Sequence, residues 1–462
     1  MKLGFTTLTA LAALLQSATA AISLDTQDVD SIKKASGELA YGLMSFYKNN
    51  QSSTPIADVG TLPDPLYWWE AGAVWGAMVD YTAYTEDTSY VATVQQALLA
   101  QVGPHSNFMP PAYFFSLGND DQAFWVLAAI SALEYDFPFP AGNASTTWLS
   151  LAEAGFNTMV PRWNMSSCNG GLSWQIFPDN VNGMSYKNSI SNGGMFQVAA
   201  RLAHYTGNQT YLDWCDKIWD WMEGVNLISA NYDVWDGTSY DNNCSDVNHQ
   251  PWSYNPSMML YGSAVLYNHT SSSVWQDRTT GLLKACANTF FSPFPNATDI
   301  AFERVCETKD TCNNDQYSFK AYLSRWLAKS AVVAPFIRDS VFQLLNSSAT
   351  AGVQTCTGGE SGELCGHKWY VGGFDGSSGV GQQLAVLETV QALLLLQDDV
   401  QPVTPVKGTT AQSGGKGRGK AEGGSVQTSA AVQAPAAPST TPAASGLVTV
   451  LKTKTVLTTA ES

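Results

Sequence analysis

The chain has 462 residues, of which 45% are hydrophobic, so a chain that is disordered throughout is excluded. Its formal net charge of -16 argues against nucleic acid as a partner. The 15 Trp and 19 Tyr residues suit a large core, and they also suit the stacking of sugar rings.

The first residues have the pattern of a secretory signal peptide. Lys2 supplies the positive end, residues 8–15 form an apolar run, and Ala18-Thr19-Ala20 fits a cleavage site. The apolar run is too short to span a bilayer, and no later segment of about 20 apolar residues occurs. We therefore expect a signal peptide at residues 1–20 and a secreted protein.

Glycosylation sequons and cysteines agree with export. Asn-x-Ser/Thr sequons start at Asn50, Asn143, Asn164, Asn208, Asn243, Asn268, Asn296 and Asn346. The even number of cysteines suggests disulfides among Cys168, Cys215, Cys244, Cys286, Cys306, Cys312, Cys356 and Cys365. Cys306 with Cys312 and Cys356 with Cys365 could close short loops, and the pairing of the other four stays open. No Cys-x-x-Cys pair with zinc spacing occurs, so we expect no metal and no cofactor.

Helical periodicity recurs between residues 26 and 398, whereas alternating strand patterns are scarce. The first segment places these apolar residues on one face: Val29, Ile32, Ala35, Leu39, Leu43 and Phe46. Twelve such segments start near residues 27, 67, 87, 120, 146, 187, 209, 253, 274, 317, 334 and 380. The fold class is therefore all-α.

Two junctions between these segments resemble each other, Tyr84–Tyr90 and Tyr205–Tyr211, and Tyr267–Thr270 is a weaker copy. A repeated helix–turn–helix unit is thus expected. Six such hairpins can close into an (α/α)6 barrel, while the alternative is an irregular helical bundle. Even-numbered segments are richer in Gly and Ala, which favours their placement in the inner ring.

Inner helices of such a barrel run parallel, so their N-termini meet at one end. The unusual motifs of the chain stand at those N-termini: Tyr67-Trp68-Trp69-Glu70, Gly118-Asn119-Asp120-Asp121, Tyr186-Lys187-Asn188, Trp252-Ser253-Tyr254-Asn255, Phe319-Lys320 with Arg325, and Asp375-Gly376. We expect them to line one cleft with aromatic walls and a carboxylate floor.

Composition changes after Asp399. Residues 401–462 begin with a stretch rich in Pro, Ala, Gly, Ser and Thr, which is typical of a disordered tail. We therefore divide the chain into the signal peptide, a catalytic domain at residues 21–400 and this tail.

Asp120 and Asp121 follow a Gly and open a helix. One Asp there would be expected to cap the helix. Two adjacent buried carboxylates oppose each other, and this opposition can keep one ionised and the other protonated. Glycoside cleavage uses such a pair. Adjacent residues can reach the ~5–5.5 Å carboxyl separation of a retaining enzyme more easily than the ~6.5–9.5 Å of an inverting one.

Other candidate residues would bind sugar. Tyr67, Trp68 and Trp69 are adjacent on a helix, so at least one should face the cleft, and Trp174 is a similar candidate from a loop. Hydrogen bonds to hydroxyls are expected from a further set, each member of which could instead serve capping or solvation: Gln175, Asn188, Tyr254, Asn255, Lys320, Arg325 and Asp375.

Five motifs in order resemble glycoside hydrolase family 76, and most closely its fungal cell-wall branch. They are Tyr67-Trp68-Trp69-Glu70-Ala71-Gly72, Gly118-Asn119-Asp120-Asp121-Gln122, Gly171-Leu172-Ser173-Trp174-Gln175, Tyr186-Lys187-Asn188-Ser189-Ile190-Ser191-Asn192-Gly193 and Trp252-Ser253-Tyr254-Asn255. The resemblance runs from about residue 30 to 395. It implies an (α/α)6 fold and a retaining endo-α-1,6-mannanase chemistry, with Asp120 as nucleophile and Asp121 as acid/base.

The resemblance also implies a biological role. Fungal members are implicated in moving glycosylphosphatidylinositol (GPI)-anchored glycoproteins onto wall glucan by cleaving the anchor glycan. The expected partners are thus a mannose-containing donor, either mannan or the GPI core glycan, and a glucan acceptor, bound by a monomer at the cell wall or outer membrane face. Such proteins are usually GPI-anchored, but here Lys452 and Lys454 interrupt the tail. Anchoring at Ser445 or Gly446 stays open.

Two alternatives come from other classes. A wall-bound mannose lectin would use the same aromatic cleft but has no need of two crowded carboxylates. An (α/α)6 hydrolase for another sugar, such as a glucuronyl hydrolase, would keep the carboxylates and change the substrate.

Overall fold

The computed structural model describes residues 22–140, 146–360, 362–398 and 402. Residues 1–20, the sequon at Asn143 and the tail, apart from Pro402, lie outside this part, so the predicted signal peptide and tail remain predictions. Within it, each of the twelve expected segments begins within about one helical turn of an observed long helix.

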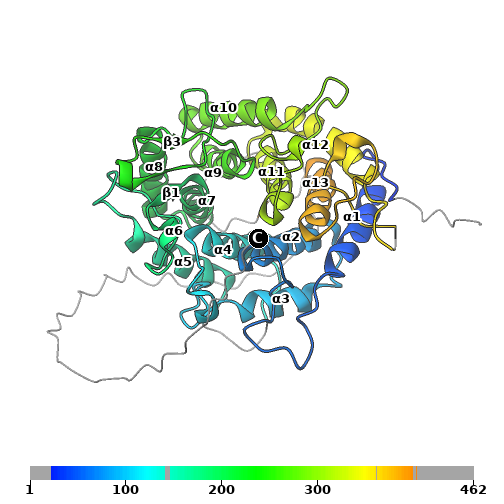
Figure 1. The fold of residues 1–462 in the computed structure, drawn as a ribbon, viewed down its shortest axis with the longest axis horizontal. Helices are drawn as coiled ribbons and strands as arrows, with labels where there is room; N and C mark the ends of the chain where they lie inside the picture. The colour runs from blue at the N-terminus through cyan, green and yellow to red at the C-terminus, as the bar shows by residue number, and fades with distance from the viewer. Residues whose placement is uncertain (1–21, 141–145, 361, 399–401, 403–462) are drawn as a thin grey trace, which may run out of the picture. The chain divides into compact units, whose positions relative to one another are not determined.

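Six helices form the inner ring (Figure 1). They are α2 (Trp68–Thr85), α4 (Asn119–Glu134), α7 (Ser189–Thr206), α9 (Tyr254–Thr270), α11 (Asn314–Val333) and α13 (Val380–Asp398). Each contacts the next in this order, and α13 returns to α2 and closes the ring. They are buried nearly all round, as residues 122–132 of α4 illustrate. The (α/α)6 prediction is confirmed.

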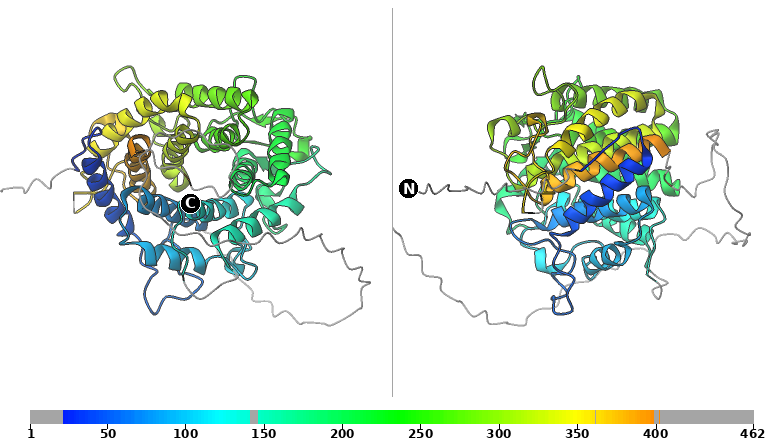
Figure 2. Two further views of the ribbon diagram at one scale, coloured as in Figure 1. Left: turned by 180° about the vertical axis from the view of Figure 1, so that it is seen from behind. Right: turned by 90° about the vertical axis from the view of Figure 1, so that its right-hand side faces the viewer.

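Six further helices surround that ring, which Figure 2 shows from behind and from the side. They are α1 (Val29–Met44), α3 (Val91–Ala100), α5 (Trp148–Met159), α8 (Gln209–Gly224), α10 (Ser273–Phe290) and α12 (Arg338–Gln354). Each buries one face against its inner neighbours, with α1 (blue) beside α13 (orange). Burial of a single apolar face is what the helical periodicity predicts.

Small residues allow the inner helices to approach closely. A Cβ atom at Gly72 of α2 would stand 2.7 Å from the Trp125 ring of α4, and one at Gly194 of α7 would stand 2.7 Å from Cβ of Ala123. Both distances are shorter than van der Waals contact, so a larger residue would push the ring apart. The Gly content of these segments therefore reflects packing within the ring.

The repeated junctions have the same hydrogen bonds in the three helices α2, α7 and α9. Thr85, Thr206 and Thr270 each donate a hydroxyl to the carbonyl four residues earlier, at 2.6 Å in every case. Each hydroxyl also accepts from the backbone N–H two residues later, at 3.2 Å. The following residue is left-handed in all three, so the weaker copy in the sequence has the full geometry.

Between α5 and α9 the chain also forms short elements that the sequence did not indicate. They are α6 (Val181–Met184) and an antiparallel sheet, in the order β1 (Tyr186–Asn188), β2 (Gly237–Ser239) and β3 (Val247–Asn248). Single-turn 3-10 helices occur at Pro111–Tyr113, Val160–Arg162, Tyr240–Asn242, Glu307–Lys309, Pro335–Ile337 and Trp369–Val371. Strands of two or three residues are too short to display an alternating pattern.

Three disulfides hold the loops outside the helices. Cys306–Cys312 and Cys356–Cys365 form as expected, and Cys168 pairs with Cys244. Cys215 and Cys286 are buried and unpaired in α8 and α10. Among the described helices, none has the length and apolar character needed to cross a membrane.

Candidate active site

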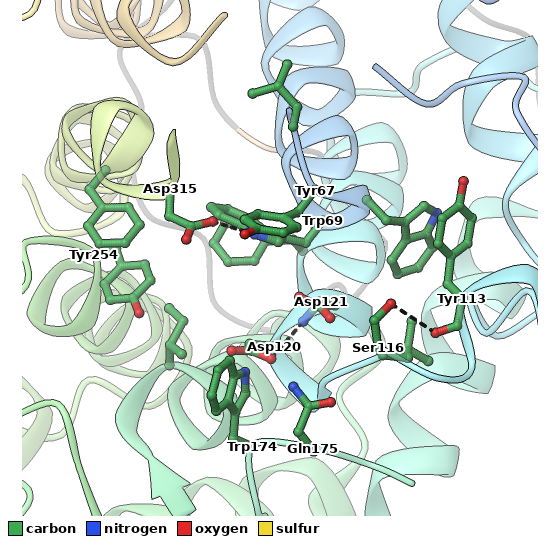
Figure 3. A pocket seen from close by; sticks show the side chains of 16 residues that line it. Tyr67, Trp69, Tyr113, Ser116, Asp120, Asp121, Trp174, Gln175, Tyr254 and Asp315 are labelled. Carbon is green, nitrogen blue, oxygen red and sulfur yellow. Dashed lines mark hydrogen bonds between the residues drawn. The ribbon is translucent and has the colours of Figure 1, made fainter. Parts of the chain in front are cut away.

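A cavity of about 480 Å³ opens where the N-termini of the inner helices meet (Figure 3). Its lining comes from α2, α4, α7, α9, α11 and the three segments 66–67, 113–117 and 174–175: Leu66, Tyr67, Trp68, Trp69, Tyr113, Ser116, Leu117, Asp120, Asp121, Phe124, Trp174, Gln175, Ile190, Tyr254, Asp315 and Phe319. The predicted position of the cleft is therefore confirmed. Aromatic rings form most of its wall, and carboxylates lie at its floor.

The start of α4 fixes the two adjacent carboxylates. Gly118 is the N-cap, and its N–H donates to Asp121 Oδ2 at 2.7 Å. The N–H of Asp121 donates to Asp120 Oδ1 at 3.1 Å. Asp121 thus does cap the helix, yet both side chains also reach the cavity. Capping and a place in the site are compatible because each carboxylate keeps a second oxygen that these contacts do not use.

The environment raises the pKa of both carboxyl groups. For Asp120 the main cause is burial, followed by the charge of Asp121, and backbone N–H groups and the Asn188 amide oppose the rise. For Asp121 burial raises the pKa to about 7, opposed by the Gly118 N–H and assisted by the charge of Asp315. Two such close groups titrate as a pair. The pair therefore retains a proton close to neutral pH.

The aromatic candidates differ in how they face the cavity. Tyr67 is 60% exposed and Trp174 is 36% exposed, so both offer ring surface to a ligand. Trp69 is partly buried and donates its indole N–H to Asp315 Oδ1 at 3.2 Å. Trp68 is part of the lining but is buried, and its indole N–H donates to Gln101 Oε1 at 2.8 Å.

Trp174 and Gln175 stand on a segment that runs between α4 and β1. The Trp174 N–H donates to the Tyr186 carbonyl at 2.6 Å, and the Trp174 carbonyl accepts from the Asn119 N–H at 2.8 Å. Gln175 forms an isolated β-bridge with Gly118. The wall of the cavity is therefore tied directly to the first residues of α4.

Lys187 holds the loop that precedes Trp174 in the chain. Its buried ammonium donates to backbone carbonyls of one loop, at 2.9 Å to Ser167 and 3.3 Å to Gly171, and also to Gly170. Burial lowers the pKa of this amine to about 8. The ammonium group of Lys187 supplies hydrogen-bond donors to these backbone carbonyls, which need them because the loop is partly buried.

Two of the predicted polar residues, Asn188 and Tyr254, lie at the site. Asn188 is the N-cap of α7, and its Nδ2 lies 3.5 Å from Asp120 Oδ2. Tyr254 lines the cavity at the start of α9 and stacks on Phe319, with 4.0 Å between ring centroids.

Lys320 and Arg325 do not reach the cavity, so we withdraw them as sugar contacts. Both project from later turns of α11 into the protein interior. Lys320 forms a buried ion pair with Glu307 at 3.1 Å. Arg325 is held by Glu388 at 2.6 Å and Asp80 at 3.6 Å. Each cation neutralises a buried carboxylate that would otherwise be costly.

Asp375 and Asn255 also lie away from the lining. Asp375 accepts backbone N–H groups of Lys368 at 2.9 Å and Ser377 at 3.1 Å, so it shapes its own loop. Asn255 is buried beside Tyr254, and its side-chain amide has no hydrogen-bond partner among the described residues. We withdraw both as sugar contacts because neither lines the cavity.

Sequence reasoning missed Asp315, Tyr113 and Ser116. Asp315 is the second residue of α11, which begins three residues earlier than its periodicity indicated. Asn313 accepts the Gln316 N–H and caps that helix. The capping box of Asn313 with Gln316 is the signal that could have placed Asp315 at an inner N-terminus. In the described part of the chain, no cluster of His, Cys, Asp and Glu could hold a metal ion.

Comparisons with known proteins agree with this geometry. Glycosyl hydrolase family 76 matches residues 31–405. The chain is 44% identical to the mannan endo-1,6-alpha-mannosidase DCW1 of Saccharomyces cerevisiae, over 80% of this chain and 81% of that protein. It is 38% identical to DFG5 of the same yeast, over 82% of this chain and 81% of that protein.

Solved structures show the same architecture. Dfg5 from Chaetomium thermophilum, in complex with glucosamine, superposes with a TM-score of 0.78 at 38% identity, covering 84% of this chain and 96% of that one. The α-1,6-mannanase GH76A of a Salegentibacter species gives 0.61 at 18% identity, covering 80% and 100%, and supports the fold alone. The chain belongs to glycosyl hydrolase family 76 and is a glycoside hydrolase built on an (α/α)6 barrel.

Proposed function

We propose that this enzyme is a retaining α-mannosidase or transglycosidase. Its donor is an α-1,6-linked mannose chain, either mannan or the GPI core glycan. In its full role it transfers GPI-anchored glycoproteins to cell-wall glucan, acting as a secreted monomer at the cell wall or the outer face of the plasma membrane.

The observation that carries this proposal is the adjacent pair Asp120–Asp121 in an aromatic cavity. Burial raises the pKa of both groups, and the charge of Asp121 adds to the rise at Asp120 while that of Asp315 adds to the rise at Asp121, so the pair holds one proton near neutral pH. One carboxylate and one carboxylic acid beside the same bond are the groups that glycoside cleavage requires.

In the first step, an oxygen of Asp120 bonds to the anomeric carbon of the donor as the bond to the leaving sugar breaks. Asp121 gives its proton to the departing oxygen. The Asn188 amide, 3.5 Å from Asp120, helps to hold that carboxylate in its ionised form. The product of this step is a mannosyl ester on Asp120 and a free leaving sugar.

In the second step, Asp121 takes the proton of an acceptor hydroxyl. The acceptor oxygen bonds to the anomeric carbon, and Asp120 leaves as a carboxylate. Two inversions at one carbon preserve the α configuration. Water as acceptor gives hydrolysis, whereas a glucan hydroxyl gives transfer.

The choice of donor rests on the relatives, which are named mannan endo-1,6-alpha-mannosidases. Binding is assigned to the exposed rings of Tyr67 and Trp174, with Trp69 and Tyr254 completing the wall and Gln175 offering an amide. Rings of this exposure can stack on sugar faces and exclude water from the acceptor side.

The test uses a fluorescent α-1,6-mannotetraose with wild type, Asp120→Asn and Asp121→Asn. Each substitution keeps the side-chain volume and removes one catalytic carboxyl group. We expect loss of turnover by at least about 10²–10⁴-fold, the range for removal of a positioned acid or base. Circular dichroism and thermal unfolding report whether each variant is folded.

Asp339→Asn is the matched control. Asp339 is the second residue of α12, as Asp315 is of α11, and it is exposed. Near-wild-type turnover in a folded Asp120→Asn or Asp121→Asn variant would refute the roles assigned to the pair. Binding without any product from the wild type would instead indicate a lectin.

A further inference from the structure

Asp315 is a third carboxylate in the active cavity. It stands at the second position of α11 and lines the same cavity as Asp120 and Asp121 (Figure 3). It reaches that cavity from a different helix than the pair. The position of Asp315 is therefore independent of the sequence adjacency of Asp120 and Asp121.

The side chain of Asp315 is held in place. The indole N–H of Trp69 donates to its Oδ1 at 3.2 Å. Trp69 in turn packs on Phe124 of α4, with 4.7 Å between ring centroids, and on Tyr322 of α11, at 5.8 Å. Asp315 is thus fixed relative to α4 through one packed ring.

The groups that face this cavity carry only negative charge or none. From α4 come Asp120 and Asp121, and from α9 comes Tyr254. Glu70 of α2 is buried and is not among the lining residues; it accepts the Tyr67 N–H at 2.7 Å through one oxygen, and its other oxygen has no hydrogen-bond partner in the described structure.

No cation balances these carboxylates at the cavity. Among the described residues that line it, none is Lys, Arg or His. Arg325, from the same helix as Asp315, is occupied by Glu388 at 2.6 Å. A negative charge at Asp315 therefore acts on the pair without local compensation.

We propose that Asp315 is a positioning residue whose negative charge helps the Asp120–Asp121 pair to keep its shared proton near neutral pH. This rests on the proposed function, because the proton matters only if Asp121 is the acid. Asp315 opposes ionisation of Asp121, while the Asn188 amide favours the ionised form of Asp120. Both influences act on two neighbouring carboxyl groups that titrate as a pair.

Burial, followed by the charge of Asp121, raises the pKa of Asp120 well above its usual range. The charge of Asp315 contributes to the raised pKa of Asp121 and to that of Glu70, which is about 8, although burial is the largest cause in both cases. Burial also raises the pKa of Asp315 itself, and the Trp69 N–H opposes that rise.

The first experiment is a pH–rate profile of kcat/KM on α-1,6-mannotetraose for wild type, Asp315→Asn and Asp315→Glu, with Asp339→Asn as control. The alkaline limb of such a profile reports the acid in the free enzyme. We expect Asp315→Asn to move that limb to lower pH by about one unit. Asp315→Glu should restore it, and Asp339→Asn should leave it in place.

A uniform loss of rate at every pH in Asp315→Asn, with both limbs unmoved, would overturn the proposal and leave only a binding or structural role. The asparagine retains an oxygen that can accept the Trp69 N–H. A shift of the limb therefore measures charge and not the loss of that hydrogen bond.

The second experiment requires no turnover. Thermal unfolding is measured from pH 5 to pH 8 for wild type, Asp121→Asn, Asp315→Asn and the double variant. Because Asp315 and Asp121 repel each other when ionised, Asp315→Asn should reduce the fall in Tm with rising pH. That benefit should shrink when Asp121 is already Asn.

The two experiments separate the two claims. Coupling in the unfolding cycle without any wild-type turnover would leave the charge interaction intact and remove the proposed function. Wild-type turnover with additive Tm changes at every pH would refute the role of Asp315 and leave the proposed function intact.

Discussion

Two groups of buried charge in this barrel differ in how they are balanced. The cavity carboxylates are Asp120, Asp121 and Asp315, and no cation lines their cavity in the described structure. The paired cluster lies among the inner helices and consists of Asp80, Glu134, Glu388, Arg201, Arg325 and Lys329. The cavity group has three carboxylates and no lining cation, whereas the paired cluster has three carboxylates and three cations.

Contacts within the paired cluster are close. Arg201 lies 2.8 Å from Glu134, and Lys329 lies 2.8 Å from Asp80. The Ser131 hydroxyl accepts from both cations at 3.0 Å. Although burial alone would raise the pKa of Glu134, the charge of Arg201 lowers it overall.

The contrast shows what cations do in a buried site. In the paired cluster Arg201 keeps Glu134 ionised, and at Glu388 the charge of Arg325 opposes the rise in pKa that burial causes, so these groups join helices through ion pairs. In the cavity burial raises the pKa of Asp120 and Asp121, and no cation among the lining residues opposes that rise, which favours proton transfer. Acidic chemistry and structural ion pairing are thus separated within one ring of helices.

The largest expected effect is on turnover. Asp120→Asn should reduce kcat by at least about 10²–10⁴-fold, while Tm at pH 7 stays equal to that of wild type or rises, because a repelling charge is removed. A parallel loss of stability and activity would mean that Asp120 belongs with the structural charges. Kinetics and differential scanning calorimetry on one preparation decide this.

Next in size is the effect of breaking the paired cluster. Arg325→Met should lower the free energy of unfolding by about 3–5 kcal/mol, because Glu388 would keep a buried charge without its ion-pair partner and Asp80 would keep only Lys329. Exposed Arg304 is the control, and Arg304→Met should change the free energy of unfolding by no more than about 0.5 kcal/mol. Equal effects of the two substitutions, measured by urea unfolding, would contradict the account.

A smaller effect is expected on kcat/KM when the substrate is negatively charged. A donor that carries a phosphate should show kcat/KM lower by about tenfold at low ionic strength, since the cavity carboxylates repel it, and added salt should narrow the gap. The comparison is made with neutral and phosphorylated α-1,6-mannotetraose. A preference for the phosphorylated donor would contradict the unbalanced charge of the cavity.

The smallest effect concerns stability and pH. The folded pKa of Asp121 is about 7, whereas that of an unfolded Asp is about 4. Its contribution to stability is fully present below about pH 4 and is lost as pH rises through 7. The double variant Asp120→Asn/Asp121→Asn should therefore lose less Tm than wild type between pH 5 and pH 8. A steeper fall in the variant would reverse the sign of this argument.

Much of the fold follows from local pattern. The outer helices bury one face, as apolar periodicity predicts, whereas the inner helices are buried nearly all round. The Thr-containing junctions repeat because each needs the same left-handed end to a helix. The Asp pair and its place at an inner N-terminus followed from adjacency and the barrel hypothesis.

What the sequence could not supply is the direction of single side chains. Lys320 and Arg325 stand on the same helix as Asp315, yet the first two point into the interior and pair with carboxylates from distant segments. Asp315 depends on where α11 begins, and a shift of a few residues at a helix start changes which side chain meets the cavity. Asp375 is bound by its own loop, a contact that no periodicity records.

The most direct measurement follows the anomeric proton of fresh product by NMR, with and without an added β-glucan oligosaccharide. The account predicts α-mannose as the first product and a transfer product that competes with or exceeds hydrolysis when acceptor is present. First release of β-mannose would contradict the two-step mechanism. Retention without transfer at high acceptor concentration would leave a simple hydrolase and contradict the proposed role in joining glycoproteins to the wall.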